Sequence, residues 1–383
     1  MKKDKFIIIT THPMSLNFFK GQIKILKNNF DVEVISSKGK ELDIFCNQQS
    51  VPGHVLNMKR NISVINDLSS LIKLIFLIKK INPKYIHANT PKASLLGILA
   101  GWILQVPKRI YYIHGLRYQE EKGFKRRILI YSEKLTTLLA THIFCVSNGL
   151  KEMLKIDKIS STEANVIHNG SINGIDFKHF SRELVEKKYN SEINKIYTNI
   201  NIRDDDFVFG YVGRIVKDKG IEELVESFMI ILQTHSSVKL LLVGPYEDKI
   251  DPISPEIKNL IENNPNIFHY DYQKDIRPFL YHMDLFVFPS YREGFGLAIL
   301  EAQAMNVPVI ASNIVGCNEI IQNNVNGLLV KKRSVSDLHD GMTKLFRDKK
   351  IRNRYISNAR ASIMSNYDQN DVWKKTIDAY LKI

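Results

Sequence analysis

Two series of short apolar runs, each alternating with helical patterns, are the feature that most constrains how this chain of 383 residues can fold. The runs are rich in Val, Ile, Leu, Phe and Tyr, and many segments between them repeat apolar residues at helical spacing. Short β-branched runs separated by helices are typical of βαβ units, whose strands form parallel sheets. The sequence therefore predicts an α/β protein in which each series forms a parallel sheet.

The first series lies in the N-terminal half of the chain. Its strands are expected near 5–10, 31–35, 85–88, 109–114, 142–147 and 164–168, with helices near 15–27, 66–80, 91–104 and 124–139. The second series starts after a polar stretch at 181–206, which is interpreted as the connection between the two domains. Its strands are expected near 207–212, 238–243, 266–270, 285–288, 307–311 and 327–330, with helices near 220–233, 256–263, 297–305 and 337–347. The length of the chain also favours two domains over one.

Charge is distributed unevenly between the two halves. Residues 1–182 hold 28 Lys and Arg against 13 Asp and Glu, whereas residues 183–383 hold 26 against 27. The basic half is expected to face an anionic partner. The best local candidate is 124–130 (FKRRILI), where basic residues adjoin apolar ones and could lie on anionic lipid. A merely solvated basic face is the alternative. Nucleic acid is not expected as a partner, because no recognition module or stacking motif accompanies the charge.

Composition is that of a cytoplasmic protein. Cys46, Cys145 and Cys317 have no metal-ligand spacing and are expected to be free thiols in a reducing compartment. The N-terminus leads straight into a strand and does not resemble a signal peptide. The longest apolar runs fall short of the roughly 20 residues that a membrane-spanning helix needs. We therefore expect a peripheral protein on the cytoplasmic face of the inner membrane.

An E-x7-E pair, Glu293 and Glu301, is the most informative motif. Glu293 lies in a two-glycine turn at the carboxyl end of the strand near 285–288. Glu301 lies about one turn into the helix that opens near Leu297. Ligands of open α/β sheets bind at this edge, and a helix N-terminus offers unpaired N–H groups to a phosphate. The two carboxylates could each hold paired hydroxyls, one pair from a sugar and one from a ribose. A solvated acidic helix start is the alternative.

A second motif follows the first strand of the second series. Gly213 permits a tight turn after that strand, and Arg214 and Lys219 then flank the start of a helix. Arginine supplies a bidentate fork and lysine a point charge, so this pair can clamp a diphosphate. A basic surface turn is the alternative.

Together the two motifs resemble those of family 4 retaining glycosyltransferases of the GT-B type. The resemblance covers nearly the whole chain and is strongest from 207 to 330. It implies two Rossmann-like, doubly wound domains facing across a cleft, an acceptor domain at 1–182 and a nucleotide-sugar domain at 204–365. The tail at 366–383, with Trp373, Ile377, Tyr380 and Leu381 on one helical stripe, resembles the last GT-B helix, which packs back on the N-terminal domain.

The resemblance also implies roles for individual residues. Arg214 and Lys219 stabilise the departing diphosphate, Glu293 binds donor-sugar hydroxyls, and Glu301 binds the ribose. The remaining donor-side positions are Gly213, Gly294, Phe295, Gly296, Leu297 and Glu319. The last of these belongs to 316–319 (GCNE), which resembles a loop before a further helix. Asn306 stands where the family usually has glycine, and asparagine tolerates the left-handed turn expected there.

In the N-terminal half, His114 ends a strand and resembles the cleft histidine of the family, which approaches donor sugar and acceptor. A structural histidine is the alternative. Thr11 and His12 are weaker acceptor-side candidates, because the Gly-Gly pair common in this loop is absent, and Ser15 is expected to cap the following helix. The segment 168–176 (HNGSINGID) resembles a subgroup that builds capsule and O-antigen on lipid-linked acceptors.

No metal or other cofactor is expected. The D-x-D pattern at Asp204-Asp205-Asp206 is interpreted as a solvated charge run, and Arg214, Lys219 and helix amides already offset phosphate charge. The expected function is transfer of a sugar, with retention, from a nucleotide donor (UDP-linked in our prediction) to a polyprenyl-diphosphate glycan. The alternatives are a GT-B epimerase or inverting transferase, and a catalytically dead basic protein that binds membrane or nucleic acid.

Overall fold

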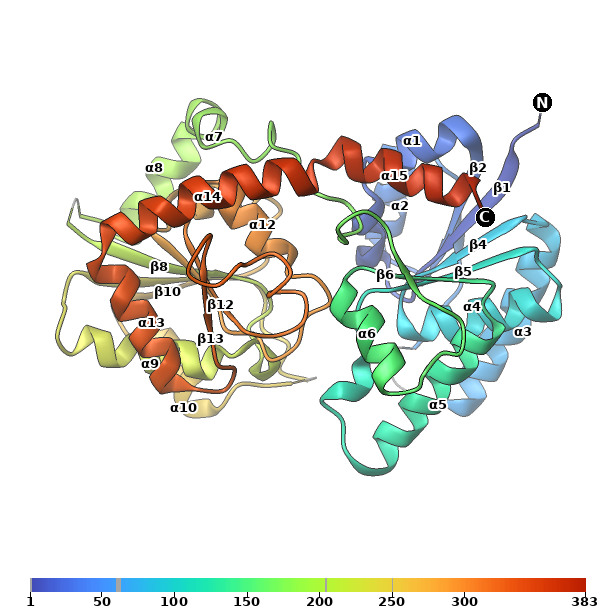
Figure 1. Ribbon diagram of the computed structural model, residues 1–383, viewed down its shortest axis with the longest axis horizontal. Helices are drawn as coiled ribbons and strands as arrows, with labels where there is room; N and C mark the ends of the chain where they lie inside the picture. The colour runs from blue at the N-terminus through green and yellow to red at the C-terminus, as the bar shows by residue number, and fades with distance from the viewer. Residues whose placement is uncertain (1, 60–62, 204, 250) are drawn as a thin grey trace. The chain divides into compact units, whose positions relative to one another are not determined.

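The computed structural model describes residues 2–59, 63–203, 205–249 and 251–383. It divides the chain into two compact units, unit 1 (1–174 with 369–383) and unit 2 (175–368). Each unit is a parallel sheet covered by helices on both faces, the doubly wound arrangement of Rossmann-like domains (Figure 1). The predicted α/β class and the two Rossmann-like sheets are confirmed.

Unit 1 contains a sheet of order β3-β2-β1-β4-β5-β6-β7. Its strands are β1 (Asp4–Ile9), β2 (Phe30–Ser36), β3 (Gly53–Val55), β4 (Tyr85–Ala88), β5 (Lys108–Ile113), β6 (His142–Cys145) and β7 (Asn165–Val166). Phe6 of β1 lies opposite Val32 of β2 and Tyr85 of β4, all of them buried. The strand order reverses between β1 and β4, so the loops after these two strands meet at the switch point where such sheets bind ligands.

The helices of unit 1, in which η marks a 3-10 helix, connect these parallel strands, apart from the last one. They are η1 (Pro13–Phe19), α1 (Gln22–Asn29), α2 (Lys40–Gln49), α3 (Val64–Ile81), α4 (Pro91–Ile103), η2 (Arg117–Gln119), α5 (Gly123–Leu139), α6 (Asn148–Ile156) and, from the end of the chain, α15 (Gln369–Leu381). The single helix expected at 15–27 is broken at Gly21, which has a positive φ of 83°. His12, and not Ser15, caps its first part, because the His12 side chain accepts a hydrogen bond from the Met14 amide.

Unit 2 contains a sheet of order β10-β9-β8-β11-β12-β13. Its strands are β8 (Phe207–Val212), β9 (Val238–Val243), β10 (Ile267–Tyr270), β11 (Leu285–Phe288), β12 (Val309–Ser312) and β13 (Leu328–Val330). Its helices are α7 (Arg182–Lys188), α8 (Asn190–Asn199), η3 (Lys217–Lys219), α9 (Ile221–Leu232), α10 (Pro255–Asn263), α11 (Arg277–Tyr281), α12 (Leu297–Ala304), α13 (Val335–Arg347) and α14 (Lys349–Tyr367). Here the order reverses between β8 and β11, so the loops carrying both motifs start at the switch point.

Three expectations need correction. The polar stretch at 181–206 holds α7 and α8, which bury Val185, Ile193 and Ile196 and pack against α11. The segment at 315–320 forms turns, so no helix follows the GCNE loop directly. In the final helix, Leu381 is exposed, whereas Val372, Thr376, Ile377 and Tyr380 are buried. The expected left-handed turn at Asn306 is confirmed by its φ of 59°.

The final helix α15 packs against α1 within unit 1 (Figure 1). Trp373 donates a hydrogen bond of 2.6 Å to the side chain of Asn173, and a Cβ placed on Gly21 would lie 2.6 Å from the Trp373 ring. Tyr380 enters an aromatic cluster with Phe6 and Phe144. Among the described residues, no helix is long and apolar enough to cross a bilayer.

Candidate active site

The two motifs of unit 2 are joined by hydrogen bonds between their loops. The loop after β8 carries Arg214 and Lys219, and the loop after β11 carries Glu293. The Tyr291 amide donates to the Asp218 carbonyl at 2.9 Å. A Cβ on Gly220 would lie 2.2 Å from the Pro289 carbonyl oxygen, and Gly220 has a φ of 68°. Only glycine allows the two loops to approach this closely.

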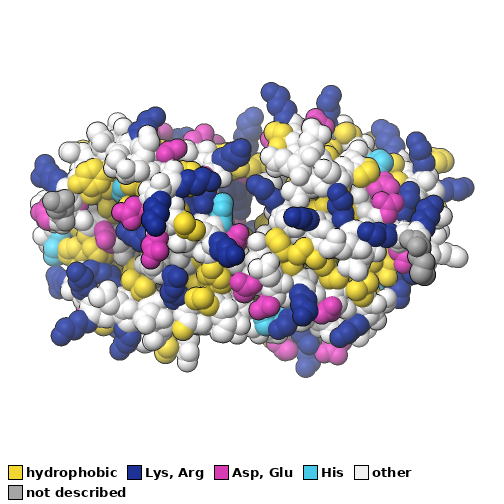
Figure 2. Space-filling view, turned by 90° about the horizontal axis from the view of Figure 1, so that it is seen from above, with side chains coloured by type: hydrophobic (Ala, Val, Ile, Leu, Met, Phe, Trp, Pro, Cys, Tyr) yellow, Lys and Arg dark blue, Asp and Glu magenta, His cyan; other side chains and the backbone are white. Residues whose placement is uncertain are grey.

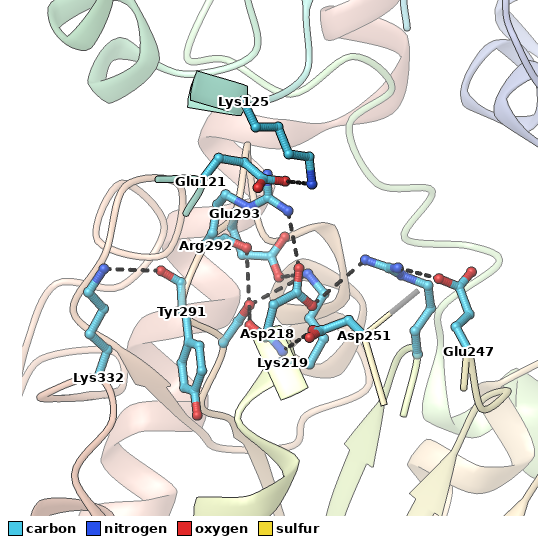
Figure 3. Close-up of polar contacts among 12 residues, drawn as sticks. Glu121, Lys125, Asp218, Lys219, Glu247, Asp251, Tyr291, Arg292, Glu293 and Lys332 are labelled. Atoms are coloured by element: carbon cyan, nitrogen blue, oxygen red, sulfur yellow. Dashed lines mark hydrogen bonds and ion pairs between the residues drawn. The ribbon is translucent and has the colours of Figure 1, made fainter. Parts of the chain in front are cut away.

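Lys219 and Glu293 form an ion pair at the centre of this arrangement (Figure 3). Lys219 Nζ lies 2.6 Å from Glu293 Oε1, and both side chains are mostly buried. A cation from one motif thus meets a carboxylate from the other, so the two motifs meet at this edge of the sheet. A buried pair of this kind is strongly coupled, and removing one partner leaves the other charge uncompensated.

Arg214 pairs with a different carboxylate. Its Nη1 atom lies 2.6 Å from Glu247 Oε2, and its Nη2 atom lies 3.9 Å from Asp218 Oδ1. Burial alone would lower the pKa of Arg214, but the hydrogen bond and charge of Glu247 outweigh it and raise that pKa above its ordinary value. Arg214 is therefore a permanent cation at the carboxyl edge of the sheet.

Arg292 is a further cation that the sequence analysis did not select. Its Nη2 atom lies 3.1 Å from Asp218 Oδ2 (Figure 3). Asp218 therefore lies within ion-pair distance of both Arg292 and Arg214. Its position directly before Glu293 in the turn is the sequence feature that could have identified it. Glu247 was also missed, although it follows β9 at the same edge of the sheet as the two motifs.

Glu301 differs from the other acidic residues of the site. It lies on α12, and its carboxyl group has no hydrogen-bond or ion-pair partner among the described residues. Burial raises the pKa of its carboxyl to about 8. A half-buried carboxyl group without a protein partner is suited to accept hydrogen bonds from a ligand.

The glycine turn before α12 leaves backbone amides at the helix start. Gly296 is the N-cap, with a φ of 33°, and offers no side-chain cap to Leu297 and the amides that follow. Gly294 is approached by the loop after β12, since a Cβ on Gly316 would lie 2.9 Å from the Gly294 carbonyl carbon. Phe295 is buried and its ring packs edge-on against Tyr367, so its side chain belongs to the core.

The other predicted donor-side residues lie around this edge. Gly213 follows β8, with its amide donating to the Val243 carbonyl. Glu319 lies in the turns at 315–320, and its carbonyl accepts a hydrogen bond of 3.4 Å from Tyr367. The D-x-D interpretation needs correction at Asp206, whose mostly buried side chain pairs with Lys239 at 3.4 Å and is not solvated. Asp204 lies outside the described residues. Among those described, no group of three or more His, Cys, Asp or Glu is arranged to hold a metal.

His114, Thr11 and His12 belong to unit 1. His114 follows β5, is half-buried, and stacks on Phe18 with ring centroids 5.2 Å apart. Burial lowers its pKa to about 4, so its ring is neutral at pH 7. The Thr11 hydroxyl accepts a hydrogen bond from the Ala93 amide at the start of α4, which makes Thr11 a cap of that helix. His12 is exposed.

Comparison with known proteins agrees with the fold. The family model "Glycosyltransferase Family 4" matches residues 24–171, and the model "Glycosyl transferases group 1" matches 192–362. The chain is 37% identical over 384 residues to the capsular polysaccharide biosynthesis glycosyltransferase CapM of Staphylococcus aureus, covering 99% of this chain and 97% of that one.

Two further relatives extend the comparison. The UDP-Gal:alpha-D-GlcNAc-diphosphoundecaprenol alpha-1,3-galactosyltransferase of Escherichia coli is 26% identical over 367 residues, or 94% of this chain and 91% of the relative. The crystal structure of HepE from Anabaena in complex with UDP and glucose superposes with a TM-score of 0.81 at 20% identity, covering 99% of this chain and 100% of that one. The chain therefore belongs to the family 4 glycosyltransferases and has the GT-B fold.

Proposed function

We propose that this glycosyltransferase moves a hexose or N-acetylhexosamine from a UDP-sugar to a polyprenyl-diphosphate-linked glycan in the synthesis of a surface polysaccharide, with retention at the anomeric carbon. The observation that carries the donor half is the Lys219–Glu293 pair, beside which Arg214 and Arg292 add positive charge. Cations at the carboxyl edge of the sheet neutralise the leaving diphosphate, and the unpartnered Glu301 accepts hydrogen bonds from a ribose.

The acceptor half is supported by the relatives. The Escherichia coli relative acts on a diphosphoundecaprenol-linked sugar, and CapM is named for capsular polysaccharide biosynthesis. UDP as the nucleotide is supported by the same Escherichia coli relative and by HepE, whose crystal structure holds UDP and glucose. Among the residues of unit 2 that the structure describes, none stands out as a nucleophile, which favours substitution on one face of the donor, with the leaving diphosphate helping to remove the acceptor proton.

The test is a transfer assay with a panel of UDP-, GDP- and ADP-sugars and a short-chain polyprenyl-diphosphate-linked sugar. A UDP-sugar should give a lipid-linked product whose new bond, followed by NMR, keeps the anomeric configuration of the donor. Inversion, or epimerised free sugar, would contradict the proposal. Because cations and helix amides offset the phosphate charge, turnover should survive EDTA. A loss that magnesium or manganese restores would show that a metal is required.

We further propose that unit 1 lies on an anionic membrane surface through α5 and α3. Phe124, Tyr131 and Leu138 recur every seven residues along α5 and are 78%, 69% and 70% exposed. Lys125, Arg126 and Arg127 adjoin the first of them and are exposed. Exposed apolar residues beside lysine and arginine are typical of helices that lie in the headgroup region of a bilayer.

Helix α3 exposes a second apolar set. Its members are Val64, Ile65, Leu68, Ile72 and Phe76. Helix α4 packs against both α3 and α5, so the three helices lie side by side (Figure 1). Charge alone does not locate the surface, because Lys and Arg side chains are scattered over the face of the molecule shown in Figure 2. The combination of exposed apolar and basic residues on α5 is the distinguishing feature.

Replacing Phe124 and Leu138 together by glutamate should weaken binding to vesicles that contain phosphatidylglycerol by about tenfold or more, because two anchors are lost and two negative charges are added. Co-sedimentation at low and high salt measures the change. Ile230→Glu on α9, which alters an exposed apolar residue of unit 2, is the matched control and should bind as the wild type. Equal binding by the control and the double variant would contradict the membrane surface.

A further inference from the structure

A chain of buried hydrogen bonds in unit 1 connects the final helix to His114. Tyr380 Oη of α15 lies 2.6 Å from His87 Nε2, and His87 Nδ1 lies 2.9 Å from Asn89 Nδ2. Asn89 Oδ1 in turn lies 3.2 Å from His114 Nε2. Tyr380, His87 and Asn89 are each at most 3% exposed, so their polar atoms have little access to water and depend on one another.

The orientation of the Asn89 amide fixes which atoms donate and which accept along these hydrogen bonds. Asn89 Nδ2 also lies 3.1 Å from the His87 carbonyl oxygen, which can only accept a hydrogen bond. The NH2 group must therefore face His87, because the flipped amide would place two oxygens in contact in a buried environment. The amide oxygen then faces His114.

The protonation of both rings follows from this orientation. Since Asn89 donates to His87 Nδ1, that nitrogen carries no hydrogen, and His87 donates from Nε2 to Tyr380. Since Asn89 Oδ1 accepts, His114 carries its hydrogen on Nε2. Burial lowers the pKa of His87 to about 3, which keeps its ring neutral. His114 Nδ1 is left as an acceptor without a protein partner among the described residues.

We propose that Asn89, His87 and Tyr380 are positioning residues that hold His114 in the Nε2–H tautomer, so that Nδ1 accepts a hydrogen bond from a sugar hydroxyl. The ring is held in place by Phe18 and Tyr112, whose ring centroids each lie 5.2 Å from that of His114. The backbone directly after His114 borders open space, because a Cβ on Gly115 would meet no atom within 4 Å. The role of His114 toward a sugar rests on the proposed function, but its tautomer does not.

The first test is independent of activity. The protein is labelled with 15N-histidine, and the ring signals of His114 are assigned by their loss in His114→Gln. Wild type should show the Nε2–H tautomer of His114 at pH 7. Asn89→Leu, which removes both halves of the amide, should give a mixture of tautomers. An Nδ1–H tautomer in the wild type, or an unchanged His114 in Asn89→Leu, would overturn the proposal.

Asn89→Asp tests the position of the amide oxygen more closely. Its carboxylate still accepts from His114 Nε2 but can donate neither to His87 Nδ1 nor to the His87 carbonyl oxygen, so the variant should also be less stable than the wild type. We expect His114 to stay in the Nε2–H tautomer and His87 to change to Nδ1–H. Transfer should fall about tenfold or more in kcat/KM for Asn89→Leu and recover in part in Asn89→Asp. Wild-type kcat/KM in Asn89→Leu, despite an altered tautomer, would remove the positioning role.

Tyr380→Phe tests the end of the hydrogen-bonded series that lies away from His114, without altering Asn89 or His114. It removes the acceptor of His87 and should lower kcat/KM less than Asn89→Leu does. Tyr85→Phe makes the same chemical change in the same aromatic cluster, outside the hydrogen-bonded chain, and should behave as the wild type. Identical ring spectra and kcat/KM for the two variants would also count against the proposal. Absence of transfer with every donor would contradict the proposed function, whereas the ring spectra alone decide the tautomer.

Discussion

Replacing Lys219 by alanine should lower kcat/KM for sugar transfer by about 30-fold or more, equivalent to ~2 kcal/mol of lost transition-state stabilisation. The Lys219 ammonium lies at the carboxyl edge of the unit 2 sheet, where it can neutralise charge on the departing diphosphate. Arg214→Ala should have an effect of similar size, because its guanidinium offers the second cation. Steady-state kinetics with the preferred UDP-sugar measure both.

The ion pair with Glu293 suggests a competing explanation for Lys219→Ala. Losing the lysine leaves a mostly buried carboxylate uncompensated, which destabilises the loop and could lower activity indirectly. The double variant Lys219→Ala/Glu293→Gln removes that charge as well. We expect it to regain thermal stability but not activity. Recovery of wild-type kcat/KM in the double variant would show that Lys219 serves only to pair with Glu293.

A surface lysine provides the matched control. Lys258 on α10 pairs with Asp248 at 2.9 Å, well away from the two motifs in sequence, and both side chains are partly exposed. Exposed pairs of this kind contribute little to stability. Lys258→Ala should therefore keep wild-type kcat/KM. Near-wild-type activity in any two of Arg214→Ala, Lys219→Ala and Glu293→Gln would refute the site.

The strands were predictable because a parallel sheet buries both of its faces, and its strands are then continuous apolar runs. Phe207–Val212 and Leu285–Phe288 are buried nearly throughout and stand out from the polar segments around them. Helices that bury few residues did not stand out. Helices α7 and α8 bury only Val185, Ile193 and Ile196 between them, so their composition is that of a linker.

The site was predictable where its chemistry lies within one loop and not where it depends on distant contacts. Lys219 and Glu293 were selected from local motifs, each at the end of an apolar strand. Their direct pairing spans 74 residues and follows from strand order, because β8 and β11 are neighbours in the sheet. The contact between His87 and Tyr380 spans 293 residues, and no local pattern marks it.

The carboxyl group of Glu301 should make donor binding depend on pH. A neutral carboxyl group carries a proton on one oxygen, so only the ionised group offers a proton-free acceptor oxygen to each of two ribose hydroxyls, and the pKa of Glu301 in the unliganded protein is about 8. Below pH 8 the group must therefore release a proton when the donor binds. Affinity for UDP should rise with pH up to about 8 and level off above it. Calorimetry between pH 6 and 9, in buffers of different ionisation enthalpy, measures both affinity and proton release.

Glu301→Gln should remove this pH dependence and weaken UDP binding at pH 8.5, while making the unliganded protein more stable at the same pH. Folding raises the pKa of Glu301 from about 4.5 to about 8. Ionisation of Glu301 therefore lowers the free energy of unfolding progressively as the pH rises from 4.5 to 8, and by a constant amount above pH 8. Glutamine cannot ionise and avoids that cost. The unfolding temperatures of variant and wild type should therefore agree near pH 4.5 and diverge by pH 8.5. A variant that is less stable at pH 8.5, or binds UDP as tightly as the wild type, would assign Glu301 to structure and not to the ribose.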